Sequence, residues 1–286
     1  MSAALRISFG GAAPVGGSAT HPAAAAVVTL VVALVAACGG RASSGSAAAR
    51  TAGDTVRVAV AANFTAPHDT IARHFTDSTG VVVVTTVGAT GQLYAQVMNG
   101  APFDVLLAAD TLRPALLEAN GAGVRGTRFT YAAGRLALYA PTQPALVDSP
   151  ERLTASAIRH VAVADSAAAP YGAAALQVLA RWNVAARIAP RLVHGESIAQ
   201  TFQFVSSGAA EAGFVALSQV IRLGGARYYV VPDSLHDRIG QDAVLLSRAT
   251  RNAAARRYLE YLRSAPARAV IESFGYAVPQ PAPPPR

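Results

Sequence analysis

The chain has 286 residues, of which 52% are apolar, and a formal net charge of +8 at pH 7. This length and apolar content are enough for one large hydrophobic core or two ordinary ones. All 24 basic residues are arginines. They are scattered singly along the chain, whereas a nucleic-acid-binding protein clusters its basic residues on one helix or strip, so we expect no nucleic-acid partner.

An uncharged apolar run of 15 residues occupies positions 23–37. It is shorter than the roughly 20 residues that span a bilayer and fits the apolar region of a signal peptide. The only cysteine, Cys38, follows directly, and VAAC (35–38) resembles the lipobox of bacterial lipoproteins, whose cysteine is lipidated. An ordinary signal peptide with an uninvolved cysteine is the alternative. We therefore expect a lipoprotein-type signal peptide at 1–37, then lipidated Cys38 and a flexible tether through residue 54.

From Val56 onward, apolar strands alternate with helices. We expect strands at 56–62, 81–87 and 103–109, and helices at 65–80, 91–100 and 111–121. The strands are nearly continuous runs of Val, Leu and Ala. Such runs are typical of parallel strands that are covered by helices on both faces.

The alternation then restarts in the second half of the chain. We expect strands at 134–141, 160–165, 191–195, 212–217, 227–232 and 241–250, and helices at 151–158, 171–184, 197–208 and 252–276, the last broken near Pro266. These are too many strands for one ordinary sheet, yet no long linker divides the chain. Two α/β lobes, each with a mixed, mostly parallel sheet, satisfy both observations if two crossing strands join them as a hinge.

The expected boundaries follow from the two crossing strands. Residues 134–141 carry the chain into the second lobe, and residues 241–247 carry it back. The predicted lobes are therefore 55–136 with 244–278, and 137–243. A proline-rich tail at 279–286 is expected to be disordered.

Several junctions between a predicted strand and a predicted helix carry small, neutral hydrogen-bonding groups. These junctions are AANFT (61–65), GATGQ (88–92), SAAAPYG (166–172) and ESIAQ (196–200). They fall at the C-terminal ends of strands, where the ligand cleft of a two-lobed α/β protein lies. Free N–H groups at helix starts bind anions, and Asn63, Thr90 and Tyr171 add further donors. Taken one at a time, each residue is also explained as a cap or turn residue.

The segments VRVAVAANFTAP, GATGQLYAQVMNGAPFDVLLAAD, APYGAAA and GFVALSQV resemble the periplasmic molybdate-binding proteins of ABC importers. The resemblance runs from about Val56 to Tyr276. It implies a two-lobed periplasmic-binding fold that closes on molybdate or tungstate and holds the ion with neutral donors. It also implies an ABC permease as partner and no cofactor, with the metal entering only as its oxyanion. We expect a monomer outside the cytoplasm, held to the membrane by its lipid.

The resemblance also implies the ligand-binding residues. Ala62 and Asn63 fall on the first ligand loop of the family, and Thr90 falls where a Ser usually binds through its hydroxyl and amide. Tyr171 matches the third contact, through its backbone N–H. Ile198 matches an apolar residue that also donates a backbone N–H.

One departure and two alternatives remain. Some family members have a ligand-binding Tyr where this chain has Ala216, so Asn63 or Tyr171 supplies the missing donor or the site has one contact fewer. If Asp165 or Glu196 points into the cleft, phosphate becomes the favoured ligand, because a carboxylate can accept the proton that phosphate carries. Sulfate is a further alternative. An enzyme on the same scaffold needs an acid, base or nucleophile there, and these two carboxylates are the only candidates on the cleft loops.

Overall fold

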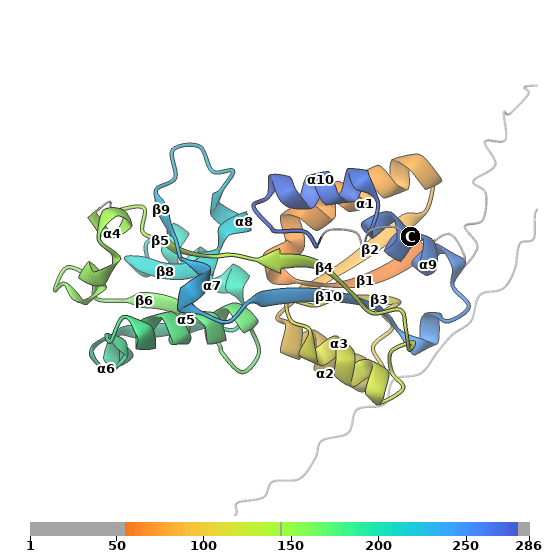
Figure 1. The fold of residues 1–286 in the computed structure, drawn as a ribbon, viewed down its shortest axis with the longest axis horizontal. Helices are drawn as coiled ribbons and strands as arrows, with labels where there is room; N and C mark the ends of the chain where they lie inside the picture. The colour runs from red at the N-terminus through yellow and green to blue at the C-terminus, as the bar shows by residue number, and fades with distance from the viewer. Residues whose placement is uncertain (1–54, 144, 280–286) are drawn as a thin grey trace, which may run out of the picture. The chain divides into compact units, whose positions relative to one another are not determined.

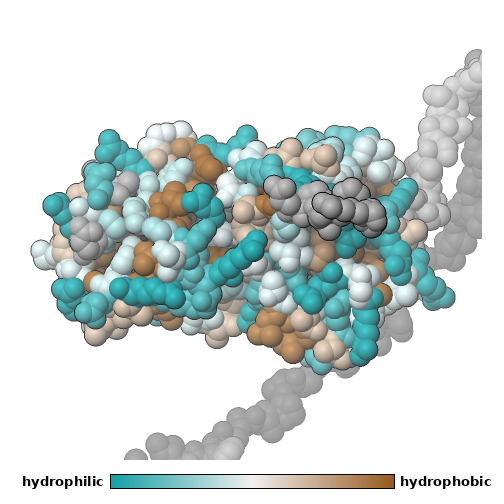
Figure 2. Space-filling view, viewed as in Figure 1, coloured by the Kyte–Doolittle hydropathy of each residue, from teal (hydrophilic) through white to brown (hydrophobic). Residues whose placement is uncertain are grey.

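The computed structural model describes residues 55–143 and 145–279. The predicted signal peptide (1–37), Cys38 and the tether through residue 54 lie outside the described residues, as does the predicted tail from residue 280. Within the described ranges, no helix is both long and apolar enough to cross a bilayer. The apolar patches on the face in Figure 2 are small and separated. One lies over helices α2 (Thr90–Met98) and α3 (Leu112–Ala119), where Leu112 and Leu116 are exposed.

The first lobe is built on a five-stranded sheet with the order β2-β1-β3-β10-β4 (Figure 1). Its strands are β1 (Thr55–Ala61), β2 (Val82–Gly88), β3 (Val105–Leu107), β4 (Phe129–Gly134) and β10 (Ile239–Leu245). Its helices are α1 (Thr65–Thr79), α2 (Thr90–Met98), α3 (Leu112–Ala119), α9 (Ala253–Leu262) and α10 (Ala265–Ser273). Side chains alternate along β1: Val58 and Val60 pack with α1, α9 and α10, whereas Ala59 packs with α2 and α3.

The second lobe has a five-stranded sheet with the order β7-β6-β8-β5-β9. Its strands are β5 (Leu136–Tyr139), β6 (Val161–Ala164), β7 (Leu192–Gly195), β8 (Ala212–Ala216) and β9 (Tyr228–Val230). Its helices are α4 (Ala145–Asp148), α5 (Pro170–Arg181), α6 (Ala185–Ile188), α7 (Ile198–Ser206) and α8 (Leu217–Val220). Helix α5 covers one face through Ala175 and Val178, and α7 covers the other through Val205.

The predicted α/β fold with two mixed sheets is confirmed. In each sheet, two strand pairs are parallel and two are antiparallel. The sheets are thus more evenly mixed than the sequence predicted. The reason is that β10, which returns from the other lobe, and β5, which enters the second lobe, run against the parallel strands beside them.

The chain passes between the lobes at two short segments. Strand β4 ends at Gly134 and β5 begins at Leu136, so the strand predicted at 134–141 corresponds to β5, and the preceding strand β4, in the other sheet, was not predicted. The whole of β10, from Ile239, pairs within the first sheet, so the return lies at 231–238 and not at the predicted boundary of 244. An apolar run marks a strand but does not say which neighbour it pairs with.

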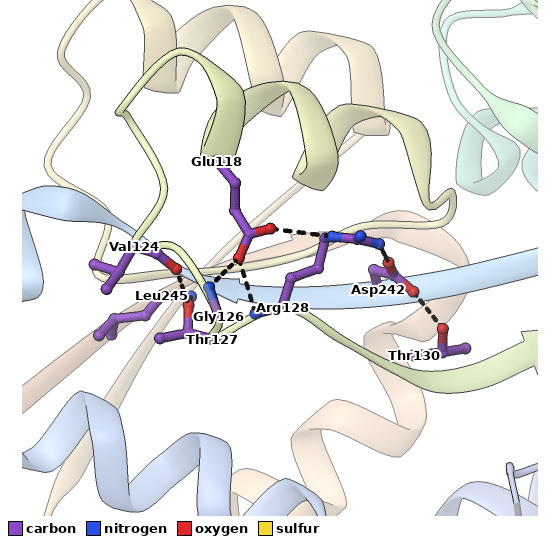
Figure 3. Close-up of polar contacts among 8 residues, drawn as sticks. All are labelled: Glu118, Val124, Gly126, Thr127, Arg128, Thr130, Asp242 and Leu245. Carbon is purple, nitrogen blue, oxygen red and sulfur yellow. Dashed lines mark hydrogen bonds and ion pairs between the residues drawn. The ribbon is translucent and has the colours of Figure 1, made fainter.

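A polar cluster ties β10 to the rest of the first lobe (Figure 3). We call Glu118, Arg128, Thr130 and Asp242 the Arg128 cluster. The guanidinium of Arg128 lies between Glu118 Oε2 at 3.3 Å and Asp242 Oδ2 at 2.6 Å, and the Thr130 hydroxyl donates to Asp242 Oδ1 at 2.6 Å. The hydrogen bond with Asp242 raises the pKa of Arg128. The cluster therefore connects α3, β4 and β10, next to a β-bulge between Gln241 and Asp242.

Candidate oxyanion site

A small cavity lies where the two lobes meet. It is lined by Ala61, Ala62, Asn63, Ala89, Thr90, Ala109, Ala169, Pro170, Tyr171 and Ile198. All five residues that the sequence predicts as ligands are in this lining. The space open to the centre of a water-sized sphere is about 10 Å³, roughly what one such sphere needs. A small ion fits such a space, whereas a sugar or a peptide does not.

The lining comes from the C-terminal ends of parallel strands. A 3₁₀ turn, η2 (Ala62–Phe64), follows β1, and α2 follows β2 in the first lobe. Helices α5 and α7 follow β6 and β7 in the second lobe. Because each lobe sends two helix starts to one cavity, their amide groups and helix dipoles converge on whatever lies between them.

Five backbone amides of the lining find no acceptor among residues 55–143 and 145–279. They belong to Ala62, Asn63, Thr90, Tyr171 and Ile198, each at the first or second position of its helix or turn, where the helix offers no partner. None of the hydrogen bonds between described residues uses these amides as donors. Free amides at helix starts are the groups with which proteins bind anions, and five of them surround this one cavity.

The Thr90 hydroxyl adds a side-chain donor. Thr90 is buried, and its Oγ1 accepts a hydrogen bond from the amide of Ala109 at 3.0 Å. Among the described residues, the hydroxyl hydrogen has no acceptor. The bond from Ala109 fixes the oxygen and leaves the hydrogen free for a ligand in the cavity.

The side chain of Asn63 has another role than the one the sequence suggested. Its Nδ2 lies 3.0 Å from Gln241 Oε1, 3.0 Å from Tyr276 Oη and 3.5 Å from Tyr171 Oη. The Tyr171 hydroxyl also accepts from Gln241 Nε2 at 3.1 Å. We call Asn63, Tyr131, Tyr171, Gln241 and Tyr276 the Gln241 network. Since this network uses the side-chain donors of Asn63, the group that Asn63 offers to a ligand is its backbone amide.

Sequence reasoning missed the other members of this network. Gln241 is fully buried and also accepts from Tyr131 Oη at 3.0 Å, and Tyr276 Oη donates to the carbonyl of Asn63 at 2.7 Å. Burial raises the pKa of Tyr276 to about 12 and that of Tyr171 well above 10. The network is therefore uncharged at neutral pH. No local sequence signal points to Gln241, because its partners are 70 or more positions away.

The position of the missing tyrosine has no substitute donor. Ala216 is not part of the cavity lining, and its amide donates to Gln219 Oε1 at 2.9 Å. The nearby Ser218 hydroxyl donates to the carbonyl of Asn63 at 2.8 Å. With Asn63 and Tyr171 engaged in the Gln241 network, this arrangement matches the alternative of one side-chain contact fewer.

No carboxylate lines the cavity. Asp165 and Glu196 are exposed and line a separate hollow with Gln92 and His194. Asp165 accepts a hydrogen bond from the amide of Ala167 at 3.0 Å, as in an Asx turn. In the described part of the chain, no group of three His, Cys, Asp or Glu residues is placed to hold a metal ion. The cavity thus offers hydrogen-bond donors and lacks a charged acceptor.

Comparisons with known proteins agree with this geometry. Residues 56–277 match the family described as bacterial extracellular solute-binding protein. The molybdate-binding protein ModA of Azotobacter vinelandii is 46% identical over 226 residues, which cover 78% of this chain and 90% of that protein. ModA of Rhodobacter capsulatus is 43% identical over 229 residues, covering 80% and 90%.

A solved structure gives the same relationship. The periplasmic molybdate-binding protein of Azotobacter vinelandii superposes with a TM-score of 0.75 at 34% identity. The match covers 79% of this chain and 100% of that one. This chain therefore belongs to the bacterial extracellular solute-binding proteins, in the family of the ModA molybdate-binding proteins.

Proposed function

We propose that this protein captures molybdate or tungstate outside the cytoplasmic membrane and delivers the ion to an ABC permease, without catalysing a reaction. The observation that carries the proposal is the uncharged cavity between the lobes, with five free backbone amides and the Thr90 hydroxyl. Molybdate and tungstate carry no proton at neutral pH, so a site for them needs donors only. The relatives named molybdate-binding proteins support molybdate within this class of anions.

The donor set disfavours phosphate. Phosphate carries a proton at neutral pH, and that proton needs an acceptor such as a carboxylate. Asp165 and Glu196, the two candidates, do not line the cavity. Sulfate is fully ionised and needs the same donors as molybdate, so it differs mainly in size.

Calorimetric titration of the purified protein with four anions tests the proposal. We expect one ion of molybdate or tungstate per protein, much weaker binding of sulfate, and no binding of phosphate. Tight binding of sulfate without any heat from molybdate would contradict the metal-oxyanion assignment. Turnover of a substrate would contradict the role of a pure binding protein.

The attachment to the membrane is a separate part of the proposal. The segment VAAC (35–38) supports lipidation of Cys38, which tethers a monomer to the membrane surface. In cells that express the full chain, Cys38→Ser should abolish incorporation of labelled fatty acid and release the protein from the membrane fraction. Light scattering of the released protein should give the mass of one chain. A variant that stays in the membrane fraction would contradict the lipid anchor.

A further inference from the structure

Two consecutive carbonyl groups of the second lobe accept hydrogen bonds from the first lobe. The Ala167 carbonyl accepts from Arg113 Nη2 at 2.6 Å, and the Ala168 carbonyl accepts from the Gly91 amide at 2.9 Å. Both carbonyls lie in the segment 165–169 between β6 and α5. This segment leads directly into Pro170 and Tyr171 of the cavity lining.

Arg113 is held in place from its own lobe. Its backbone amide donates to Asp110 Oδ1 at 2.8 Å, and its Nη1 forms an ion pair with Asp110 Oδ2. Asp110 follows Ala109 of the cavity lining, but neither Asp110 nor Arg113 lines the cavity. The aspartate thus neutralises the guanidinium and fixes its plane, and the free edge of the guanidinium bonds the opposite lobe. Arg113 is thus a cation that lies near the cavity without lining it.

The accepting segment is also held. The Ala169 amide donates to the Asp165 carbonyl at 2.8 Å, and the Ala167 amide donates to Asp165 Oδ1. These bonds fix the turn whose carbonyls meet the first lobe. A pull on the segment is therefore transmitted to the start of α5, where the free amide of Tyr171 lies.

Gly91 shows how closely the lobes approach. It is the second residue of α2, next to Thr90 of the cavity lining. A Cβ added to Gly91 would lie 3.0 Å from the Ala168 Cα and 3.1 Å from Arg113 Nη2. A side chain at this position would therefore separate the lobes by pushing against the backbone of the 165–169 segment.

We propose that Arg113 and Gly91 form a latch that holds the lobes closed over the bound anion, with Arg113 as a positioning residue that sets how long the anion stays bound. The inference rests on the proposed function. The latch bonds join two lobes, so they exist only in the closed protein. They slow release of the anion, and they do not stabilise the open, unliganded protein.

The test compares two latch variants with a matched control. Arg113→Gln removes the charged donor, and Gly91→Ala adds the obstructing methyl group while favouring helix α2. The control is Arg159→Gln, which breaks an exposed ion pair with Glu211 at the far, N-terminal end of β6. Release of radiolabelled molybdate into excess unlabelled molybdate gives the dissociation rate. Thermal melting of the unliganded proteins gives their stability.

We expect each latch variant to release molybdate about tenfold faster than the wild type. Arg113→Gln loses one charge-assisted hydrogen bond, and Gly91→Ala adds a methyl group that pushes against the opposite lobe. The association rate should change by less than about twofold, because the anion meets the open protein before the lobes close and the latch bonds form. The unliganded melting temperature should fall only slightly for Arg113→Gln, which loses its pair with Asp110 within the first lobe, and should not fall for Gly91→Ala. Arg159→Gln should release the ion at the wild-type rate.

Two results would overturn the latch while leaving the proposed function intact. One is release at the wild-type rate from both latch variants. The other is a melting temperature of the unliganded variants that falls markedly together with affinity, because this would identify the two residues as structural. If the wild type binds tungstate or sulfate but not molybdate, the same rates are measured with that anion. A wild type that binds none of these anions would overturn the proposed function and the latch with it.

Discussion

Gln241 and Asp242 are neighbours on β10, and both are completely buried, yet they belong to two different kinds of polar network. Gln241 bonds the neutral side chains of Asn63, Tyr131 and Tyr171 behind the cavity wall. Asp242 forms an ion pair with Arg128, which also pairs with Glu118. The protein keeps the buried carboxylate of Asp242 in a cluster that stabilises one lobe, and it supports the cavity with uncharged groups.

The difference has a physical reason. A carboxylate in an enclosed anion site repels the ligand by several kcal/mol, whereas amide and hydroxyl dipoles attract it without competing for a proton. In the Arg128 cluster the same carboxylate is compensated by a guanidinium and a hydroxyl. The comparison predicts that changes to the Gln241 network and the cavity alter affinity, and that changes to the Arg128 cluster alter stability.

The most severe way to break this division is to place a carboxylate in the Gln241 network. Asn63→Asp keeps the shape of the side chain and adds a negative charge at the cavity wall. We expect molybdate affinity to fall on the order of 1000-fold, about 4 kcal/mol, measured by calorimetry at pH 8. Circular dichroism of the unliganded variant checks that it folds. An affinity within about tenfold of the wild type would show that the neutral network is not required.

The converse change removes the cation from the Arg128 cluster. Arg128→Gln leaves Asp242 buried with only the Thr130 hydroxyl as a side-chain partner. We expect the free energy of unfolding to fall by about 3 kcal/mol, the lower end of the range for breaking a buried pair, because Arg128 is partly exposed. Urea denaturation of the unliganded protein measures this loss. A variant with wild-type stability and weakened molybdate binding would reverse the assignment of the two networks.

A smaller effect on affinity is expected from the hydroxyl of Thr90. Thr90→Ala removes the hydroxyl donor of the lining and leaves the Ala109 amide without its acceptor. Molybdate binding should weaken by about 2 kcal/mol, within the range for a lost buried donor. Thr90→Ser retains the hydroxyl and should bind nearly as the wild type does. Equal affinities for Ala and Ser at this position would mean that Thr90 only begins the helix.

His68 is a third kind of buried polar side chain in the first lobe, because it belongs neither to the Gln241 network nor to the Arg128 cluster. Neither ring nitrogen has a hydrogen-bond partner among the described residues, and the ring packs 6.1 Å from that of Tyr258. Burial lowers the pKa of His68 from 6.5 to about 4. The ring is therefore neutral at pH 7, and its 3.8 Å approach to Asp69 is not an ion pair there.

This shift makes the stability depend on pH. Between pH 6.5 and about 4 the unfolded chain binds a proton at His68 that the folded chain does not, so stability falls as the pH falls. From pH 6.5 to pH 5 we expect the loss to be about 1.5 kcal/mol. Urea denaturation at several pH values should show this slope in the wild type and a flatter profile in His68→Leu. Identical slopes would contradict the assignment.

The alternation of strands and helices, and the free amides at helix starts, were accessible from the sequence. Both are local properties: an apolar run predicts a strand, and the residues after it begin a helix. The resemblance to a known family then selected Ala62, Asn63, Thr90, Tyr171 and Ile198, and the structure brings all five to one cavity. That they bind the anion stays a prediction.

What the sequence did not reveal depends on distant contacts. The role of the Asn63 side chain follows from Gln241 and Tyr276, which are 178 and 213 positions away. The register of β4 against β10 shifts between Gln241 and Asp242, which depends on how two strands distant in sequence pair. The alanines of the lining, such as Ala89 and Ala109, carry no chemical signal, because their contribution is to leave room.

Gly134, the last residue of β4, also leaves room, and this gives the hinge a practical use. A Cβ added there would lie 2.0 Å from Tyr171 Oη and 2.6 Å from Gln241 Nε2. Tyr171 comes from the second lobe, so a methyl group at this point is a wedge between the lobes. Gly134→Ala would therefore hold the lobes apart and keep the protein in its open form. Such a variant shows whether a permease distinguishes the open binding protein from the closed, loaded one.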